Sequence, residues 1–139
     1  MICGFGTTRG EHRCMMHFGI PAYRLPRAVL NEEIQRIESM GVKIVLDHKV
    51  DDVLAEKEAG NFDAVFIAVG AHIGKKINIP ARDASQILDA VSFLKEVESG
   101  RTPKLGRRVA IYGGGNTAMD AARTAKRLGA QEAIIVYRR

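Results

Sequence analysis

Three small residues near the end of the chain have the spacing of a phosphate-binding turn. They form the pattern Gly113-x-Gly115-x-x-Ala118, between an apolar segment at 108–112 and a helical pattern at 117–128. In such a turn the first glycine permits the tight bend, the second lets the backbone approach a pyrophosphate, and the third small residue lets the helix pack closely on the strands. Unpaired amides and the positive end of the helix dipole then attract the phosphates. The predicted dinucleotide-binding residues are Gly113, Gly114, Gly115, Asn116, Thr117 and Ala118.

The segment around this turn has the order and length of a βαβ unit. We expect a strand at 108–112, a helix at 117–128 and a second strand at 133–137, all within the 31 residues of 107–137. One face of the expected helix carries only small residues: Ala118, Ala121, Ala122 and Ala125. The alternative is a glycine turn in a structural unit that binds nothing, but the strand–turn–helix–strand context favours nucleotide binding.

The end of the second strand indicates which nicotinamide nucleotide would bind. A site for NAD usually carries an acidic residue about 20 positions beyond the glycines, where it accepts hydrogen bonds from the ribose 2′-hydroxyl. This chain has Arg138 and Arg139 there instead. Guanidinium groups suit a 2′-phosphate through charge-assisted, forked hydrogen bonds, so we predict NADPH. The alternative is that both arginines are simply solvated.

Apolar periodicity predicts the other elements. The expected elements are helices at 26–40 and 86–98, strands at 43–46 and 63–69, a charged turn or helix beginning at Asp51 and Asp52, and an extended segment at 77–80. Pro26 is expected as the first residue of its helix and Gly41 as its stop. Residues 1–14 show no apolar period and are expected to be irregular, whereas the polar connector 99–106 marks a domain boundary. Strands that alternate with helices indicate an α/β fold with parallel strands and flanking helices.

Composition excludes several classes of protein. Of 139 residues, 46% are hydrophobic and 27% charged, which is ordinary for one globular domain. The longest apolar run, at 64–71, has eight residues and is too short to span a membrane. The N-terminus does not have the pattern of a secretory signal. We therefore expect no membrane partner.

The charged residues and cysteines give no sign of nucleic acid or metal. The formal net charge is +5, but the basic residues are spread along the chain and are not interleaved with aromatic residues, so nucleic-acid binding is not expected. The four histidines lack ligand spacing: His12, His17, His48 and His72. Cys3 and Cys14 form no CxxC pair, and we interpret them as free thiols in a reducing cytoplasm.

Four segments together resemble a known family. GIPAYRLP at 19–26, DAVFIAVGA at 63–71, GGGNTAMD at 113–120 and VYRR at 136–139 match, in order and spacing, the small (beta) subunit family of glutamate synthase. That family consists of FAD- and NADPH-dependent reductases. The resemblance covers about residues 15–139 and implies a partial Rossmann-like FAD/NAD(P)-binding fold.

The resemblance also implies roles for individual residues. Gly113 to Ala118 would hold the NADPH pyrophosphate, and Arg138 with Arg139 the 2′-phosphate. Gly19, Ile20 and Pro21 would lie near the flavin, and Gly70 would end the strand that approaches the FAD. In such enzymes hydride passes from NADPH to FAD, and electrons continue through iron–sulfur clusters to a glutamate synthase large-subunit-like partner. The flavin carries the redox chemistry, so we assign no catalytic acid or base.

The sequence departs from the family pattern at both ends. It lacks an earlier FAD-binding glycine fingerprint and the cysteine-rich iron–sulfur segment, and it stops after the second strand of the NADPH domain. We therefore expect a truncated reductase. Residues 1–100 would be part of an FAD-binding domain, and 101–139 the first βαβ unit of an NADPH-binding domain. Residues 1–14 would be translated from a shifted reading frame, out of register with the family sequence. FAD would bind only in the complete protein. The chain alone should need the remainder of the reductase or a partner to cover apolar surface.

Three alternatives compete with this interpretation. A thioredoxin-reductase-like enzyme would need a redox CxxC just before the NADPH-domain strand, and residues 99–107 contain no cysteine. A non-catalytic NADPH-binding module could be built from the same βαβ unit. An inactive fragment of a reductase is the third. A flavin spectrum would separate the leading hypothesis from the last two.

Overall fold

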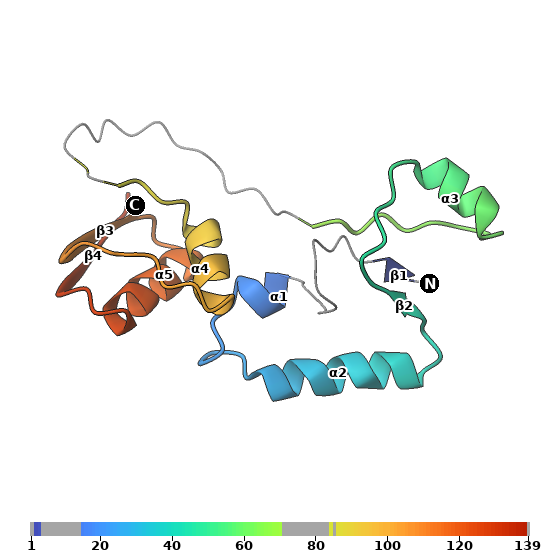
Figure 1. Cartoon of the computed structure of the whole chain (residues 1–139), viewed down its shortest axis with the longest axis horizontal. Helices are drawn as coiled ribbons and strands as arrows, with labels where there is room; N and C mark the ends of the chain where they lie inside the picture. The colour runs from blue at the N-terminus through green and yellow to red at the C-terminus, as the bar shows by residue number, and fades with distance from the viewer. Residues whose placement is uncertain (1, 4–14, 71–83, 85, 139) are drawn as a thin grey trace. The chain divides into compact units, whose positions relative to one another are not determined.

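The computed structural model describes residues 2–3, 15–70, 84 and 86–138 (Figure 1). The chain folds into two compact units. Unit 1 contains Met1–Cys14 and Arg27–Gly70, and unit 2 contains Met15–Pro26 and Ala71–Arg139. None of the described helices is long and apolar enough to cross a membrane.

Unit 2 contains the predicted βαβ unit. Strands β3 (Arg108–Tyr112) and β4 (Glu132–Val136) pair in parallel from Arg108↔Glu132 to Tyr112↔Val136, and helix α5 (Asn116–Arg127) connects them. Parallel strands require such a crossover, because a tight hairpin cannot join them. The predicted bounds are confirmed to within one residue, since the apolar alternation, the glycines and the helical period are all local signals.

The core of unit 2 lies between α5, the sheet and helix α4 (Ala90–Glu98). Helix α5 contacts both strands, and α4 lies against α5 (Figure 1). The small face of α5 is buried as predicted, with Ala125 only 1% exposed. It packs with Phe93 and Leu94 of α4 and Ile111 of β3. Small side chains let these elements approach closely, and the larger residues opposite fill the space between them.

Helix α4 begins later than predicted. The sequence places its start at residue 86, but the helix runs from Ala90 because Asp89 is its N-cap. The Asp89 carboxylate accepts a hydrogen bond from the Ser92 amide at 2.8 Å. An acidic N-cap satisfies one of the free amides of the first turn and so fixes where the helix starts.

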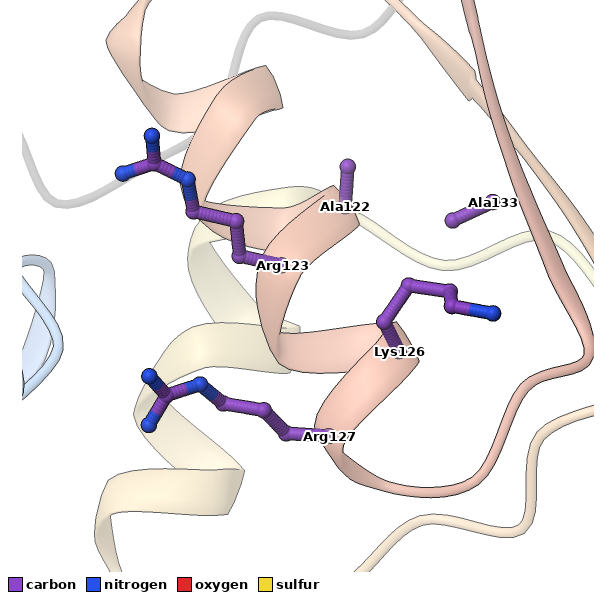
Figure 2. A pocket seen from close by; sticks show the side chains of 5 residues that line it. All are labelled: Ala122, Arg123, Lys126, Arg127 and Ala133. Atoms are coloured by element: carbon purple, nitrogen blue, oxygen red, sulfur yellow. The ribbon is translucent and has the colours of Figure 1, made fainter.

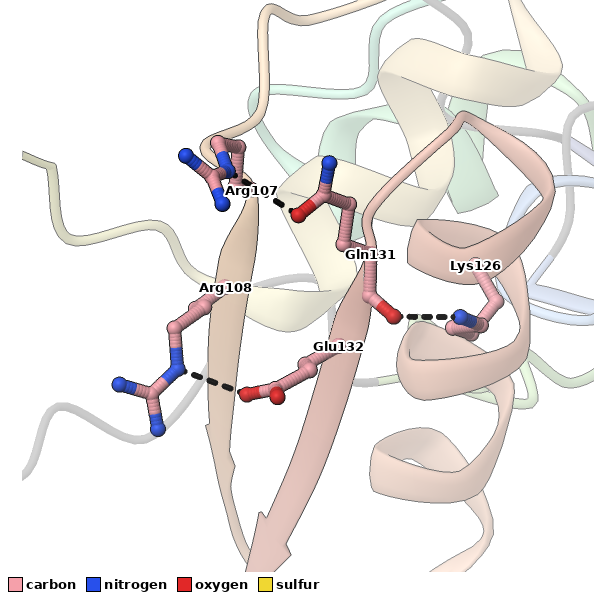
Figure 3. Close-up of polar contacts among 5 residues, drawn as sticks. All are labelled: Arg107, Arg108, Lys126, Gln131 and Glu132. Atoms are coloured by element: carbon pink, nitrogen blue, oxygen red, sulfur yellow. Dashed lines mark hydrogen bonds and ion pairs between the residues drawn. The ribbon is translucent and has the colours of Figure 1, made fainter.

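Polar contacts fix the amino ends of β3 and β4 (Figure 3). Arg108 Nε donates to Glu132 Oε2 at 2.7 Å, and Arg107 Nε donates to Gln131 Oε1 at 3.0 Å. Lys126 Nζ donates to the Gln131 carbonyl oxygen at 2.7 Å. These contacts lie at the end of the sheet opposite the glycine turn.

Replacing Arg108 by alanine should have little effect on stability. Its side chain is 74% exposed and that of Glu132 is 54% exposed, so water screens the pair. We expect the free energy of unfolding to fall by less than about 0.5 kcal/mol. Urea denaturation followed by circular dichroism measures this change. A loss of several kcal/mol would mean that this ion pair, rather than the alanine face, sets the strand register.

Unit 1 contains α2 (Arg27–Ser39), the parallel pair β1 (Ile2–Cys3) and β2 (Ile44–Val45), and α3 (Val53–Ala59). The predicted helix at 26–40 is confirmed, although it begins one residue after Pro26. The backbone turns out of the helix at Gly41, whose φ is +88°. The segment predicted as a charged turn or helix is a helix, α3, and Asp52 is its N-cap.

Two predictions for the strands of unit 1 need correction. Residues Ile2–Cys3 form β1, so the interpretation of 1–14 as irregular is wrong for these two residues. The predicted strand at 63–69 is not formed: its backbone is irregular, and Phe66 is 91% exposed. A strand exists only where a neighbour takes its backbone hydrogen bonds, and no described strand pairs with this segment. The predicted extended segment at 77–80 lies outside the described residues.

Candidate nucleotide-binding site

Gly113 makes the bend between β3 and α5. Its φ of +142° lies in a region that side chains strongly disfavour. The Gly113 amide donates to the Val136 carbonyl oxygen at 2.8 Å, which ties the bend to the end of β4. A Cβ built on Gly113 would lie 3.6 Å from the Ala118 Cβ, in ordinary contact. Backbone conformation, rather than lack of space, therefore requires glycine at this position.

Gly114 packs against the aromatic ring of Tyr137. A Cβ built on Gly114 would lie 3.0 to 3.2 Å from three carbon atoms of Tyr137, closer than side chains normally approach. The turn after β3 and the residue after β4 are thus in direct contact. The role of Gly114 is to let them pack.

Gly115 leaves an open cradle at the start of α5. It is the N-cap residue, with φ −83° and ψ 176°, and no side chain caps the helix. A Cβ on Gly115 would meet nothing within 4 Å. Its carbonyl oxygen accepts from the Ala118 and Met119 amides, whereas no described group accepts from the Asn116 and Thr117 amides. Open space beside free amides and the positive helix end fits an anionic pyrophosphate.

Arg138 lies at the same edge of the sheet as the glycine turn. Strands β3 and β4 are parallel and in register, so their carboxyl ends meet beside Gly113. Arg138 is the second residue after β4 and is exposed. In open α/β sheets, ligands bind outside the carboxyl ends of the strands, which places this cation on the ligand side. Arg139 lies outside the described residues.

Gly19, Ile20 and Pro21 also belong to unit 2. The Gly19 amide donates to the Met15 carbonyl oxygen at 2.7 Å, at the end of the short helix α1 (Met15–Phe18), and a Cβ on Gly19 would overlap the Met15 side chain. Ile20 is half-buried and Pro21 is buried. The Pro21 carbonyl oxygen accepts from the amides of residues 24 and 25, which closes a tight turn.

Gly70 belongs to unit 1, unlike the other candidate residues. It is exposed and has a φ of +67°, a conformation that glycine adopts readily. The structure therefore brings the glycine turn and Arg138 to one edge of unit 2, whereas Gly70 belongs to the other unit.

Sequence reasoning missed an ion pair on α5. Arg24 Nη1 lies 2.6 Å from Asp120 Oδ2, and Asp120 is only 2% exposed. Next to it, the Tyr23 hydroxyl donates to the Asp120 carbonyl oxygen at 3.4 Å. One signal was available: Asp120 is a charged residue adjacent to the small face of a helix, where burial demands a partner. Its partner, 96 positions away, was not predictable.

A hollow of about 420 Å³ lies beside the second half of α5 (Figure 2). Its lining residues are Ala122, Arg123, Lys126, Arg127 and Ala133. Arg123 and Arg127 extend to one side of the helix and Lys126 to the other, so the cations do not converge. Lys126 is bonded to the Gln131 carbonyl, and the Arg127 guanidinium stacks on Tyr23. Cations at a helix C-terminus are favourable without any ligand, and we assign none.

Comparison with known proteins agrees with this geometry. The family model described as pyridine nucleotide-disulphide oxidoreductase matches residues 2–139. The matched range includes residues 2–14, which counts against the hypothesis that this segment is out of register.

Three relatives illustrate the similarity. The chain is 41% identical over 129 residues to "NADPH-Fe(3+) oxidoreductase subunit beta" of Geobacter sulfurreducens, covering 90% of this chain and 19% of that protein. It is 43% identical over 129 residues to "NADP(+)-dependent formate dehydrogenase subunit beta" of Moorella thermoacetica, covering 90% and 18%. It is 33% identical over 135 residues to "Putative glutamate synthase (NADPH) small chain" of Cereibacter sphaeroides, covering 90% and 33%.

The chain thus spans between about a fifth and a third of the length of these relatives. The family match extends over nearly every residue, and the βαβ unit with its glycine turn has the corresponding architecture. This chain belongs to the pyridine nucleotide-disulphide oxidoreductase family, whose fold is a Rossmann-like domain that binds FAD and NAD(P).

Proposed function

We propose that the chain is a segment of a flavin-dependent oxidoreductase that takes hydride from NADPH. The observation that carries this proposal is the open cradle at Gly115, where free amides and the helix N-terminus face the sheet edge that also bears Arg138. The names of the relatives support NADPH as the nucleotide, since all three include NADPH or NADP(+).

Each part of the cradle has a defined task in this proposal. The amides at the start of α5 bind the pyrophosphate, and the lack of side chains from Gly113 to Gly115 lets the backbone approach it. Arg138 and Arg139 bind the 2′-phosphate through charge-assisted hydrogen bonds. None of these residues exchanges a proton with the substrate, so the chain binds and orients the nucleotide.

FAD would accept the hydride in the complete protein, because a flavin supplies two-electron redox chemistry that side chains lack. We propose, from the resemblance to the glutamate synthase small subunit, that Gly19, Ile20, Pro21 and Gly70 lie on the flavin side. We accordingly propose that 1–100 is part of an FAD-binding domain and that 101–139 opens the NADPH-binding domain.

The same resemblance supports a proposal for the electron acceptor and the partner. Relatives are named as beta subunits and as a small chain, which supports a second subunit or domain as partner here. We propose iron–sulfur-linked electron transfer of the glutamate synthase type to that partner, in the cytoplasm. Reduced Cys3 and Cys14 would be stable in that compartment.

Titration of the ¹⁵N-labelled chain with NADPH and with NADH, followed by NMR, tests the proposal. NADPH should shift the amide signals of residues 113–118 and bind more tightly than NADH. Arg138→Glu should raise the Kd for NADPH roughly 10- to 100-fold, the equivalent of one lost charge-assisted hydrogen bond, and leave the Kd for NADH nearly unchanged.

The matched control is Arg108→Glu, which makes the same charge change at the opposite end of the sheet and should leave both affinities nearly unchanged. Equal affinities for NADPH and NADH in the wild type would refute the assigned specificity. No shift at residues 113–118 with either nucleotide would refute the binding site itself.

A further inference from the structure

Three contacts attach residues 23 and 24 to helix α5. Arg24 Nη1 lies 2.6 Å from Asp120 Oδ2. The Tyr23 hydroxyl donates to the Asp120 carbonyl oxygen at 3.4 Å, and the Arg127 guanidinium carbon lies 3.9 Å from the centre of the Tyr23 ring. All of these residues lie in unit 2. The tight turn after Pro21 is therefore fastened to the helix that begins at the glycine cradle.

The carboxylate of Asp120 depends on Arg24. Asp120 is 2% exposed, and its Oδ1 atom is buried without a hydrogen-bond donor among the described residues. Among the residues that the structure describes, only Oδ2 has a partner, and that partner is the Arg24 guanidinium. A buried carboxylate that loses its counter-ion keeps the full cost of desolvation. Arg24 would not bear the same cost if it lost Asp120, because its side chain is 37% exposed and can reach water.

Asp120 lies close to the position that a pyrophosphate would take. It follows the N-cap Gly115 by five residues, about 7.5 Å along the axis at 1.5 Å per residue. At such a distance a buried carboxylate repels a bound anion appreciably. With Arg24 in contact, the pair presents almost no net charge to the cradle.

We propose that Arg24 is a positioning residue for NADPH binding. Arg24 neutralises Asp120 and so prevents this carboxylate from repelling the pyrophosphate. The inference rests on the proposed function, because it concerns the same cradle. Its consequence is an asymmetry between the two partners. Loss of Arg24 exposes the bound nucleotide to an uncompensated negative charge, whereas loss of the Asp120 charge does not.

The test is the NADPH titration of four variants, with thermal unfolding measured on each. Arg24→Gln should raise the Kd on the order of tenfold. Asp120→Asn should bind NADPH at least as tightly as the wild type, and the double variant should recover wild-type affinity within about twofold. Arg24→Lys keeps the charge and should recover most of the affinity. If Arg24→Gln does not fold, weaker NADPH binding by Asp120→Asn or by the double variant than by the wild type would still overturn the inference.

The matched control is Arg123→Gln, which removes one positive charge from an exposed position on the same helix. It should change the Kd less than twofold. Two outcomes would overturn the inference. An equal loss of NADPH affinity in Arg24→Gln and Arg123→Gln would show that only the overall charge of the protein matters. Weak NADPH binding in Asp120→Asn and in the double variant would show that the ion pair acts through packing alone. Failure of the proposed function looks different, because the wild type itself would then bind no NADPH.

Discussion

Replacing Ala125 by leucine should lower the free energy of unfolding by about 3 kcal/mol, because extra methylenes in a packed core force neighbouring side chains out of their rotamers. Ala125 is 1% exposed and belongs to a cluster that includes Phe93, Leu94 and Ile111. The close approach of α5 to α4 and the sheet leaves no room for a larger side chain. Urea denaturation followed by circular dichroism measures the loss.

The control is Met119→Leu on the same helix. Met119 is 41% exposed, and the replacement conserves volume, so the free energy of unfolding should change by less than about 0.5 kcal/mol. If Ala125→Leu proved as stable as this control, close packing of the small face could not be what holds unit 2 together.

Replacing Gly115 by serine should separate binding from stability. A Cβ at this position meets nothing within 4 Å, and serine is a preferred N-cap residue, so the free energy of unfolding should stay the same or rise by a few tenths of a kcal/mol. The same side chain would fill the space at the cradle and compete for the free amides of the first turn. We expect NADPH affinity to fall roughly 30-fold, the equivalent of about 2 kcal/mol.

Gly106→Ser is the matched control, because a Cβ there would make only an ordinary contact of 3.7 Å with the Arg108 carbonyl oxygen. This variant should keep both stability and affinity. Thermal unfolding and NMR titration on the same samples give the two readouts. A Gly115→Ser protein that binds NADPH as well as the wild type would show that the nucleotide does not use this turn.

The sequence by itself determined the βαβ unit of unit 2. Its signals are local: the glycine spacing, the alanine face of α5 and the apolar alternation of β3 and β4 all act within a few residues. For that reason the predicted bounds agree with the structure to within one residue. The helix at 26–40 was predictable for the same reason, and Asp89 shows that a missed cap displaces a predicted helix start by several residues.

Tertiary structure decided what depends on distant partners. The apolar composition of residues 63–69 is typical of a buried strand, yet a strand also needs neighbours to take its hydrogen bonds, and composition does not reveal whether they are present. Burial of Asp120 with Arg24 joins residues 96 positions apart, a contact that no local pattern encodes. The glycine pattern indicated where a pyrophosphate could bind. Only the packing of residues 23 and 24 on α5 identified the cation that neutralises the carboxylate near that site.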